Sequence, residues 1–316
     1  MTQSVESSVT AVTGVAAPRT VEHDIPLYLA SDEALIHILD RYPEDLLEIH
    51  SSDLDADGQG SLSAATRARP DGRTILAAIK AGRLSVSLRS CERAHPGLWA
   101  EAQRAFQNLS PQLGAATKGF SRARKMTGEL VLCSPTARVP FRFDAAGIVV
   151  FHLRGVKRVW VYPGTEDFLP QPAMENVIAG AATEQLAHQR IMDGAAWRFD
   201  IVPGEALTWP LYAPHRVENQ EGLCVSLSMT YETWPSRITT GAHRANALLR
   251  RWNHTIKPMA QTGWTHRTML WALSLAFVAL NLVKANVKLA ERTYNAAEAK
   301  NVSDVSVLMR ETKEAA

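Results

Sequence analysis

The chain has little cysteine, little net charge and no long apolar run, and each absence excludes a class of protein. Its 316 residues include three cysteines, Cys91, Cys133 and Cys224, and no CxxC pair. This odd, widely spaced set argues against a disulfide framework or an all-cysteine zinc site and favours a reducing compartment, so we expect a cytoplasmic protein. The formal net charge of +2 gives no reason to expect a nucleic-acid partner.

Signals of export and of nucleotide binding are also absent. The first 22 residues have neither the basic start nor the apolar stretch of a signal peptide, so we interpret 1–22 as a flexible tail. No glycine-rich phosphate loop and no nucleophile elbow appear in the sequence. These absences argue against a nucleotide-dependent enzyme and against an α/β-hydrolase.

The composition that remains is that of a folded protein, with 46% hydrophobic and 21% charged residues. Residues 23–125 are expected to form a mixed helical region that packs on a core. Within it, helical spacing predicts helices over 31–48, with Ser31 as the N-cap, and over 73–83 and 97–107. The alternation in 83–89 predicts a strand.

From about residue 126 to 235 the pattern changes to short β-branched and aromatic runs broken by glycine and proline. Examples are "GELVLCS", "GIVVFHL", "KRVWVYP", "WRFDIVP" and "LCVSLSMTY". Runs of this length and spacing are typical of an antiparallel jelly roll. The predicted fold class is therefore mainly β with flanking helices.

Two stretches carry a resemblance to a known family. They are "CSPTARVPFRFDAAGIVVFHLRGVKRVWVYP" (133–163) and "IVPGEALTWPLYAPHRV" (201–217). In this order they resemble the jumonji-C-like, or cupin-like, branch of the iron(II)- and 2-oxoglutarate-dependent oxygenases, over roughly 120–235. The resemblance implies a double-stranded β-helix fold, and Fe(II) and 2-oxoglutarate as cofactors.

The resemblance also implies a metal site, which this sequence alters. In the family, a histidine, an aspartate and a distant histidine hold the iron. Here Asp144 takes the carboxylate position and His215 the distal histidine position, but Arg142 stands at the first histidine. A guanidinium has no lone pair for a metal, so we expect Arg142 to displace the metal and to pair with Asp144, two residues away on the same face of a strand. His152, eight residues after Asp144, is a candidate third ligand.

The same comparison assigns an anion-binding role to one lysine. Lys157 matches the family lysine that pairs with the far carboxylate of 2-oxoglutarate, with a surface charge as the alternative. Val139 replaces the usual threonine, and Ile148 stands where some members have a polar residue. With these changes, the cofactors either bind in an altered pocket or bind without supporting turnover.

The C-terminal segment, 236–316, is a separate basic and helical unit. From Arg237 onward there are 12 Lys or Arg residues against 5 Asp or Glu, whereas residues 1–236 carry 22 against 27. Its apolar run, 269–283, is shorter than the roughly 20 residues that span a bilayer. Four- and three-residue steps along 269–289 predict a helix that forms a homodimer. Docking of this helix on a membrane surface is the alternative.

Two functions follow from these observations. The first is a non-catalytic binding or regulatory module, with a retained anion pocket and an incomplete iron site. The second is a 2-oxoglutarate-dependent dioxygenase that hydroxylates a peptide side chain or a small molecule with an altered metal shell. Arg142 and Val139 favour the first.

Overall fold

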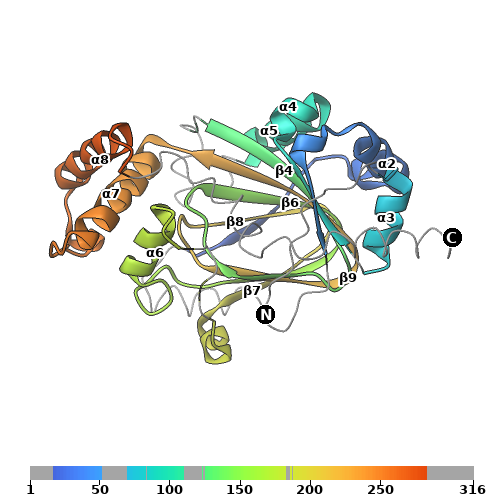
Figure 1. The fold of residues 1–316 in the computed structure, drawn as a ribbon. Helices are drawn as coiled ribbons and strands as arrows, with labels where there is room; N and C mark the ends of the chain where they lie inside the picture. Colours follow the sequence, from blue (N-terminus) through green and yellow to red (C-terminus); the bar gives the residue numbers. More distant parts are fainter. Residues whose placement is uncertain are drawn as a thin grey trace.

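The fold was analysed in a computed structural model, which describes residues 17–51, 70–82, 84–109, 123, 125–182, 186 and 188–282. The described strands form one antiparallel sheet in the order β1-β8-β6-β9-β4-β3-β2, with β5 added to β9 and β7 to β6. This sheet folds over on itself, as Figure 1 shows, and the predicted jelly-roll fold is confirmed. The strands are β1 (Arg19–Glu22), β2 (Leu47–Ser51), β3 (Leu84–Arg89), β4 (Lys125–Cys133), β5 (Arg138–Arg142), β6 (Gly147–Val161), β7 (Trp197–Ile201), β8 (Glu205–Trp209) and β9 (His215–Glu232).

Two long strands, β6 and β9, join the two halves of the jelly roll. The first part of β6 pairs with β8 and its last part with β7, while β9 pairs with β6 along most of its length. Between His152 and Lys157 the register of β6 against β9 shifts three times. Gly155 lies at this bulge with φ +81°, and a Cβ there would be 2.6 Å from the carbonyl oxygen of Leu223. A β-bulge of this kind bends a strand, and only glycine fits the close approach.

The bulge also changes which residues of β6 face the inside of the jelly roll. Before it, the even-numbered Ile148 and Val150 belong to the interior apolar cluster, and after it the odd-numbered Val159 and Val161 do. Side chains point to alternate faces along a strand, so a bulge changes whether the even-numbered or the odd-numbered residues face the interior. The odd-numbered residues before the bulge, such as Phe151, pack in a second core beneath the N-terminal helices.

The N-terminal helices cover one face of the sheet (Figure 1). The prediction of helices near 73–83 and 97–107 is confirmed, as is the strand near 83–89. Ser31 caps its helix as predicted, accepting a hydrogen bond from the backbone N–H of Ala34 at 3.3 Å. The helices are α2 (Asp32–Arg41), α3 (Gly72–Lys80), α4 (Cys91–Ala94) and α5 (Pro96–Leu109).

Two of the expected boundaries in this region were wrong. The helix predicted over 31–48 ends at Arg41, because Pro43 restricts the residue before it to extended backbone, and 47–51 is strand β2 instead. The tail predicted over 1–22 is ordered at its end, where β1 pairs with β8 from Arg19 to Glu22. Residues 1–16 lie outside the described part. The N-terminal region therefore supplies three strands of the sheet as well as helices.

After β9 the chain forms a helical hairpin at the opposite end of the molecule from α2 and α3 (Figure 1). It consists of α7 (Trp234–Arg251) and α8 (Trp264–Ala279), which pack on each other and, through α7, on α6 (Gln171–Ile178). Within the described residues, the helix predicted over 269–289 differs in its extent, because α8 starts at Trp264 and ends at Ala279. Positions 283–289 of that prediction, like the rest of 236–316 beyond 282, lie outside the described part. Asn281 has φ 54°, and the backbone N–H groups of Asn281 and Leu282 bond back to Val278 and Phe277, which is a Schellman stop.

Candidate functional site

The three residues that the sequence assigns to the metal position lie together at one end of the jelly roll. Arg142 ends β5 and His215 begins β9, and the two are cross-strand partners. Asp144, just after β5, lies between them: its Oδ1 is 3.6 Å from a guanidinium nitrogen of Arg142, and its Oδ2 is 3.5 Å from Nε2 of His215. The arginine, the carboxylate and the imidazole therefore form one contiguous group.

His215 is held in a neutral form. It is 5% exposed, its ring centroid lies 4.6 Å from that of Trp209, and its Nδ1 donates a hydrogen bond to the carbonyl of Ala213 at 3.2 Å. Burial lowers the pKa of His215; the Asp144 carboxylate opposes this and the Arg142 guanidinium reinforces it. With its proton on Nδ1, the neutral ring directs the lone pair of Nε2 towards Asp144.

These residues do not match the donor set of a facial triad. Asp144 and His215 could supply two ligands, and Oδ2 of Asp144 is buried without a hydrogen-bond partner in the described part of the chain. The third position holds a guanidinium, which cannot coordinate a metal. Within the described residues, no group of three or more histidine, cysteine or carboxylate side chains is placed to hold a metal ion. Two ligands beside a fixed positive charge do not fit the iron that the sequence resemblance implies.

Lys157 lies further along the interior, on β6 just after the bulge. It is 7% exposed, and its Nζ donates a hydrogen bond to Oγ of Ser226 on β9 at 2.8 Å. No carboxylate forms an ion pair with it among the residues that the structure describes. Isolated charges are costly to bury. This ammonium therefore stands where a bound anion would balance its charge.

Both ring nitrogens of His152 have hydrogen-bond partners other than Asp144 and His215. Its Nε2 donates to the carbonyl of Gly155 at 2.9 Å, and its Nδ1 is 2.9 Å from Oγ of Ser226. Burial, with the positive charge of Lys157, lowers the pKa of His152 to about 3, so the ring is neutral. A chain of hydrogen bonds results, from Lys157 through the Ser226 hydroxyl and His152 to Gly155. The candidate third ligand is thus joined to the lysine and not to Asp144 and His215.

Ser226 is the residue of this group that the sequence analysis missed. Its signal was present, because it is a hydroxyl between Val225 and Leu227 in a largely apolar part of β9. Serines in such strands are common, however, and only the register of β9 against β6 brings this one to His152.

A second polar group lies on the outer side of the same strands. Tyr162 donates a hydrogen bond to Asp193 at 2.5 Å, and Arg216 binds both of them, while its guanidinium carbon lies 3.4 Å from the ring centre of Trp160. Burial, followed by the bond to Asp193, raises the pKa of Tyr162. This network ties the ends of β6 and β9 to the segment before β7, and so stabilises the rim near Arg142 and His215.

Comparison with known proteins finds similar structures but no sequence relatives. No protein-family model matches the chain, and no curated protein does. The ribosomal oxygenase YcfD from Escherichia coli is similar at 14% identity with a TM-score of 0.43, over 86% of this chain and 65% of that chain. A structure of YcfD in complex with cobalt and 2-oxoglutarate has 13% sequence identity and a TM-score of 0.42, over 83% of this chain and 63% of that chain. A deletion mutant of oxalate decarboxylase OxdC from Bacillus subtilis has 18% sequence identity and a TM-score of 0.24, over 37% of this chain and 24% of that chain.

These neighbours are of the kind that the sequence resemblance predicts. The jelly-roll fold of this chain rests on the strand order of its own sheet. The chain covers a little under two thirds of the length of the YcfD chains, and TM-scores of 0.43 and 0.42 are too low to assign this chain to their family. What YcfD binds or modifies is therefore not transferred to this chain by the comparison.

Proposed function

We propose that this chain is a cupin-like binding or regulatory module that holds a small organic anion on Lys157 and does not perform iron-dependent catalysis. One observation carries the proposal: the buried ammonium of Lys157 has a serine hydroxyl as its hydrogen-bond partner and no carboxylate among the described residues. A dicarboxylate such as 2-oxoglutarate supplies the missing charge.

The residues around Lys157 are arranged to hold it in one orientation. An ammonium has three N–H donors, and the bond to Ser226 uses one of them, so two remain for a carboxylate. Ser226 accepts from Lys157 and donates to His152, which donates in turn to Gly155. Arg142, which pairs with Asp144 at 3.6 Å, adds a second positive charge at the position where an oxygenase would hold its metal.

The first test is titration calorimetry of the whole chain with 2-oxoglutarate. Lys157→Met should weaken binding by about 10-fold or more, since a charge-assisted hydrogen bond contributes roughly 1.5–3 kcal/mol. Lys125→Met is the matched control, because Lys125 is 64% exposed on β4. Equal binding by wild type and Lys157→Met would contradict the anion role.

A working oxygenase with an altered metal shell, acting on a peptide side chain or a small molecule, is the second candidate. One arrangement favours it: Nδ1 of His215 is held by a backbone carbonyl, and Nε2 faces a carboxylate oxygen that lacks a hydrogen-bond partner in the described part. Metal-binding histidines are commonly oriented in this way.

Anaerobic titration with iron(II), followed by metal analysis, separates the two candidates. We expect substoichiometric iron in the wild type and a gain of binding in Arg142→His, because an imidazole then replaces the guanidinium. One tightly bound iron per wild-type chain, lost in Asp144→Ala and accompanied by succinate formation from 2-oxoglutarate, would establish the oxygenase instead.

A further inference from the structure

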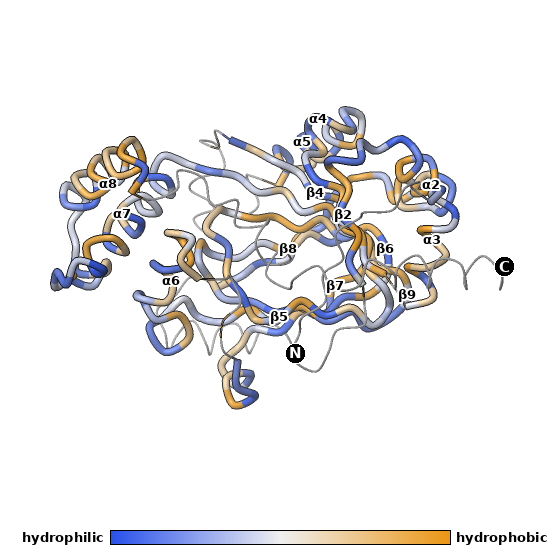
Figure 2. The backbone as a smooth tube through the Cα atoms, viewed as in Figure 1, coloured by the Kyte–Doolittle hydropathy of each residue, from blue (hydrophilic) through white to orange (hydrophobic). Residues whose placement is uncertain are grey.

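The outer face of α8 is apolar although it is open to solvent. Its inner face packs Leu270 and Phe277 against α7. On the outside, Met269 is 71% exposed and Leu275 48%, and Leu280, just past the helix, is 68% exposed. Figure 2 shows apolar residues around most of this helix. A surface helix normally has a polar outer face, so the exposed apolar face of α8 indicates a surface that binds a partner.

Exposed apolar side chains are concentrated on the hairpin as a whole. Of the eleven large hydrophobic residues exposed in the described part, seven lie between 234 and 282, and three of these are tryptophans. Tryptophan is enriched where one end of a side chain is apolar and the other is wet, as at the interface of a membrane. The seven are Trp234, Trp252, Trp264, Met269, Leu275, Leu280 and Leu282.

The charge of the hairpin indicates the chemistry of the partner. No acidic residue occurs between Glu232 and Glu291, whereas eight Lys or Arg residues do. Some of these serve the fold: Arg250, for example, binds the buried Glu175 at 2.8 Å. Others, including Arg251 and Lys257, are exposed. A second copy of this surface would bring like charges together, whereas an anionic surface complements them.

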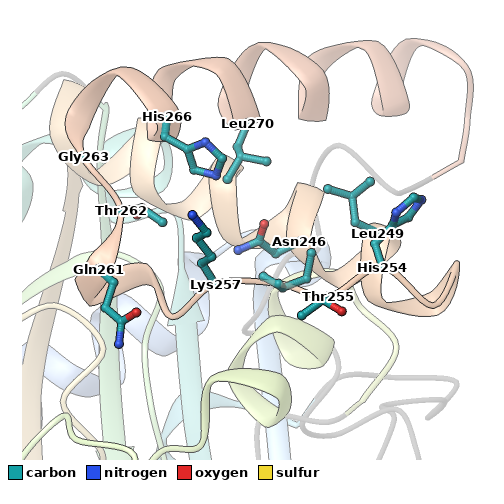
Figure 3. Close-up of a pocket in the computed structure, with 11 residues that line it drawn as sticks. Asn246, Leu249, His254, Thr255, Lys257, Gln261, Thr262, Gly263, His266 and Leu270 are labelled. Carbon is teal, nitrogen blue, oxygen red and sulfur yellow. The ribbon is translucent and has the colours of Figure 1, made fainter.

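A cavity of about 470 Å³ opens between α7, the connection 253–263 and the first turns of α8 (Figure 3). Its lining combines Lys257, His254 and His266 with the side chains of Leu249 and Leu270. Basic and apolar groups thus lie together, which suits a molecule with an anionic head and an apolar tail.

The α7–α8 hairpin is held in place by contacts with α6 and by close packing of its two helices. Glu175 on α6 is fully buried and accepts hydrogen bonds from Gln171 at 2.6 Å, Asn246 at 3.1 Å and Arg250 at 2.8 Å, so α7 is fixed to α6. At the crossing of the two helices, Gly241 leaves room for Trp271, since a Cβ at Gly241 would lie 2.4 Å from that ring. A rigid surface binds without a large cost of ordering.

We propose that the α7–α8 hairpin docks on the surface of an anionic phospholipid membrane. α8 lies in the interface, with Met269, Leu275 and Leu280 towards the acyl chains and Arg251 and Lys257 towards the headgroups. With 16 residues, α8 is about 24 Å long, short of the hydrocarbon core of a bilayer. In the described part of the chain, no helix has the length and apolar character needed to cross a membrane.

The proposal is tested by flotation of the full chain with two kinds of vesicle, phosphatidylcholine alone and phosphatidylcholine with an equimolar amount of phosphatidylglycerol. The protein should float with the anionic vesicles, and added salt should release it as the Debye length falls from about 10 Å to about 3 Å. The variant Met269→Glu with Leu275→Glu should bind at least about 10-fold more weakly, because two apolar contacts are lost. Ile191→Glu is its control, a residue 85% exposed outside the hairpin.

A second pair of variants tests the charges separately. Arg251→Glu with Lys257→Glu should weaken binding by about fivefold or more for each residue, whereas Arg73→Glu with Arg93→Glu, exposed on α3 and α4, should not. Circular dichroism and light scattering check that each variant folds.

Three outcomes would overturn the proposal. One is equal, salt-insensitive binding to both kinds of vesicle. Another is a stable dimer without vesicles that Met269→Glu dissociates, which would make a second copy the partner. The third is a monomer that ignores vesicles, as expected if residues 283–316 of the same chain cover this face.

Discussion

At the residue scale, the guanidinium of Arg142 determines which ligands the site around Asp144 can bind. Arg142 places a fixed positive charge 3.6 Å from the carboxylate, and together with burial it helps to keep His215 neutral. A divalent ion at the same place would be repelled by the guanidinium and would have two ligands instead of three. An anion near Lys157 would not be repelled in this way.

The hydroxyl of Ser226 is expected to be the least replaceable polar group in the interior. Ser226→Ala removes the partner of both Lys157 and His152, and leaves a buried donor and a buried acceptor unsatisfied. We expect the free energy of unfolding to fall by about 1–3 kcal/mol, measured by urea denaturation. Ser228→Ala, half-buried two residues along the same strand, is the control. A loss no larger than that of the control would show that the hydrogen-bond chain contributes nothing to stability.

At the scale of the element, the bulge in β6 is what brings Lys157, the residue proposed to bind an anion, to the interior. His152 and Lys157 are five residues apart, so an uninterrupted strand would direct them to opposite faces. The register shifts between them place both beside Ser226. The bend also lets β6 pair first with β8 and then with β7.

Gly155→Ala tests the bulge directly. A Cβ at this position would meet the carbonyl oxygen of Leu223 at 2.6 Å, and φ +81° is strained for any other residue. We expect a loss of about 1–3 kcal/mol in the free energy of unfolding, and weaker binding of 2-oxoglutarate because Lys157 is displaced. Gly222→Ala separates the two causes: Gly222 has φ +66°, but a Cβ there would have no neighbour within 4 Å. Similar losses in the two variants would mean that strain, and not the close approach, requires glycine at 155.

At the scale of the whole molecule, the jelly roll buries several imidazoles in their neutral form. Burial, with the charge of Arg89, lowers the pKa of His50 to about 4. Burial and Lys157 lower that of His152 to about 3. A histidine in the unfolded chain has a pKa near 6.5. Below that pH the unfolded chain takes up protons that the folded chain does not, so stability is fully present above about pH 6.5 and is lost as the pH falls towards these lower values.

The free energy of unfolding should therefore decrease between about pH 6.5 and pH 4.5, before most carboxylates titrate. Each such histidine contributes a slope of up to about 1.4 kcal/mol per pH unit. Urea denaturation across this range measures it, and His152→Gln should make the slope shallower. His37→Gln, exposed on α2, should leave the slope as it is. A stability that does not change over this interval would contradict the neutral burial of these rings.

Much of the architecture could be predicted from the sequence, because it depends on local patterns. Alternating apolar runs predict the strands, and Ser31 predicts the start of α2, since a side-chain oxygen at that position satisfies a free N–H of the first turn. The proximity of Arg142 and Asp144 follows from their spacing, and the basic character of the C-terminal segment follows from composition. Each of these properties is carried by residues close to one another in the chain.

Other features depend on residues that are distant in sequence, and only the tertiary structure determines them. The close approach of Leu223, 68 residues beyond Gly155, determines which side chains of β6 face the interior after the bulge. It thereby also determines the partners of Lys157 and His152. Arg19–Glu22 form a strand because β8 offers a free edge. The outer face of α8 is left exposed because α7 covers the inner face. Local periodicity specifies which elements form, whereas long-range contacts determine which side chains meet.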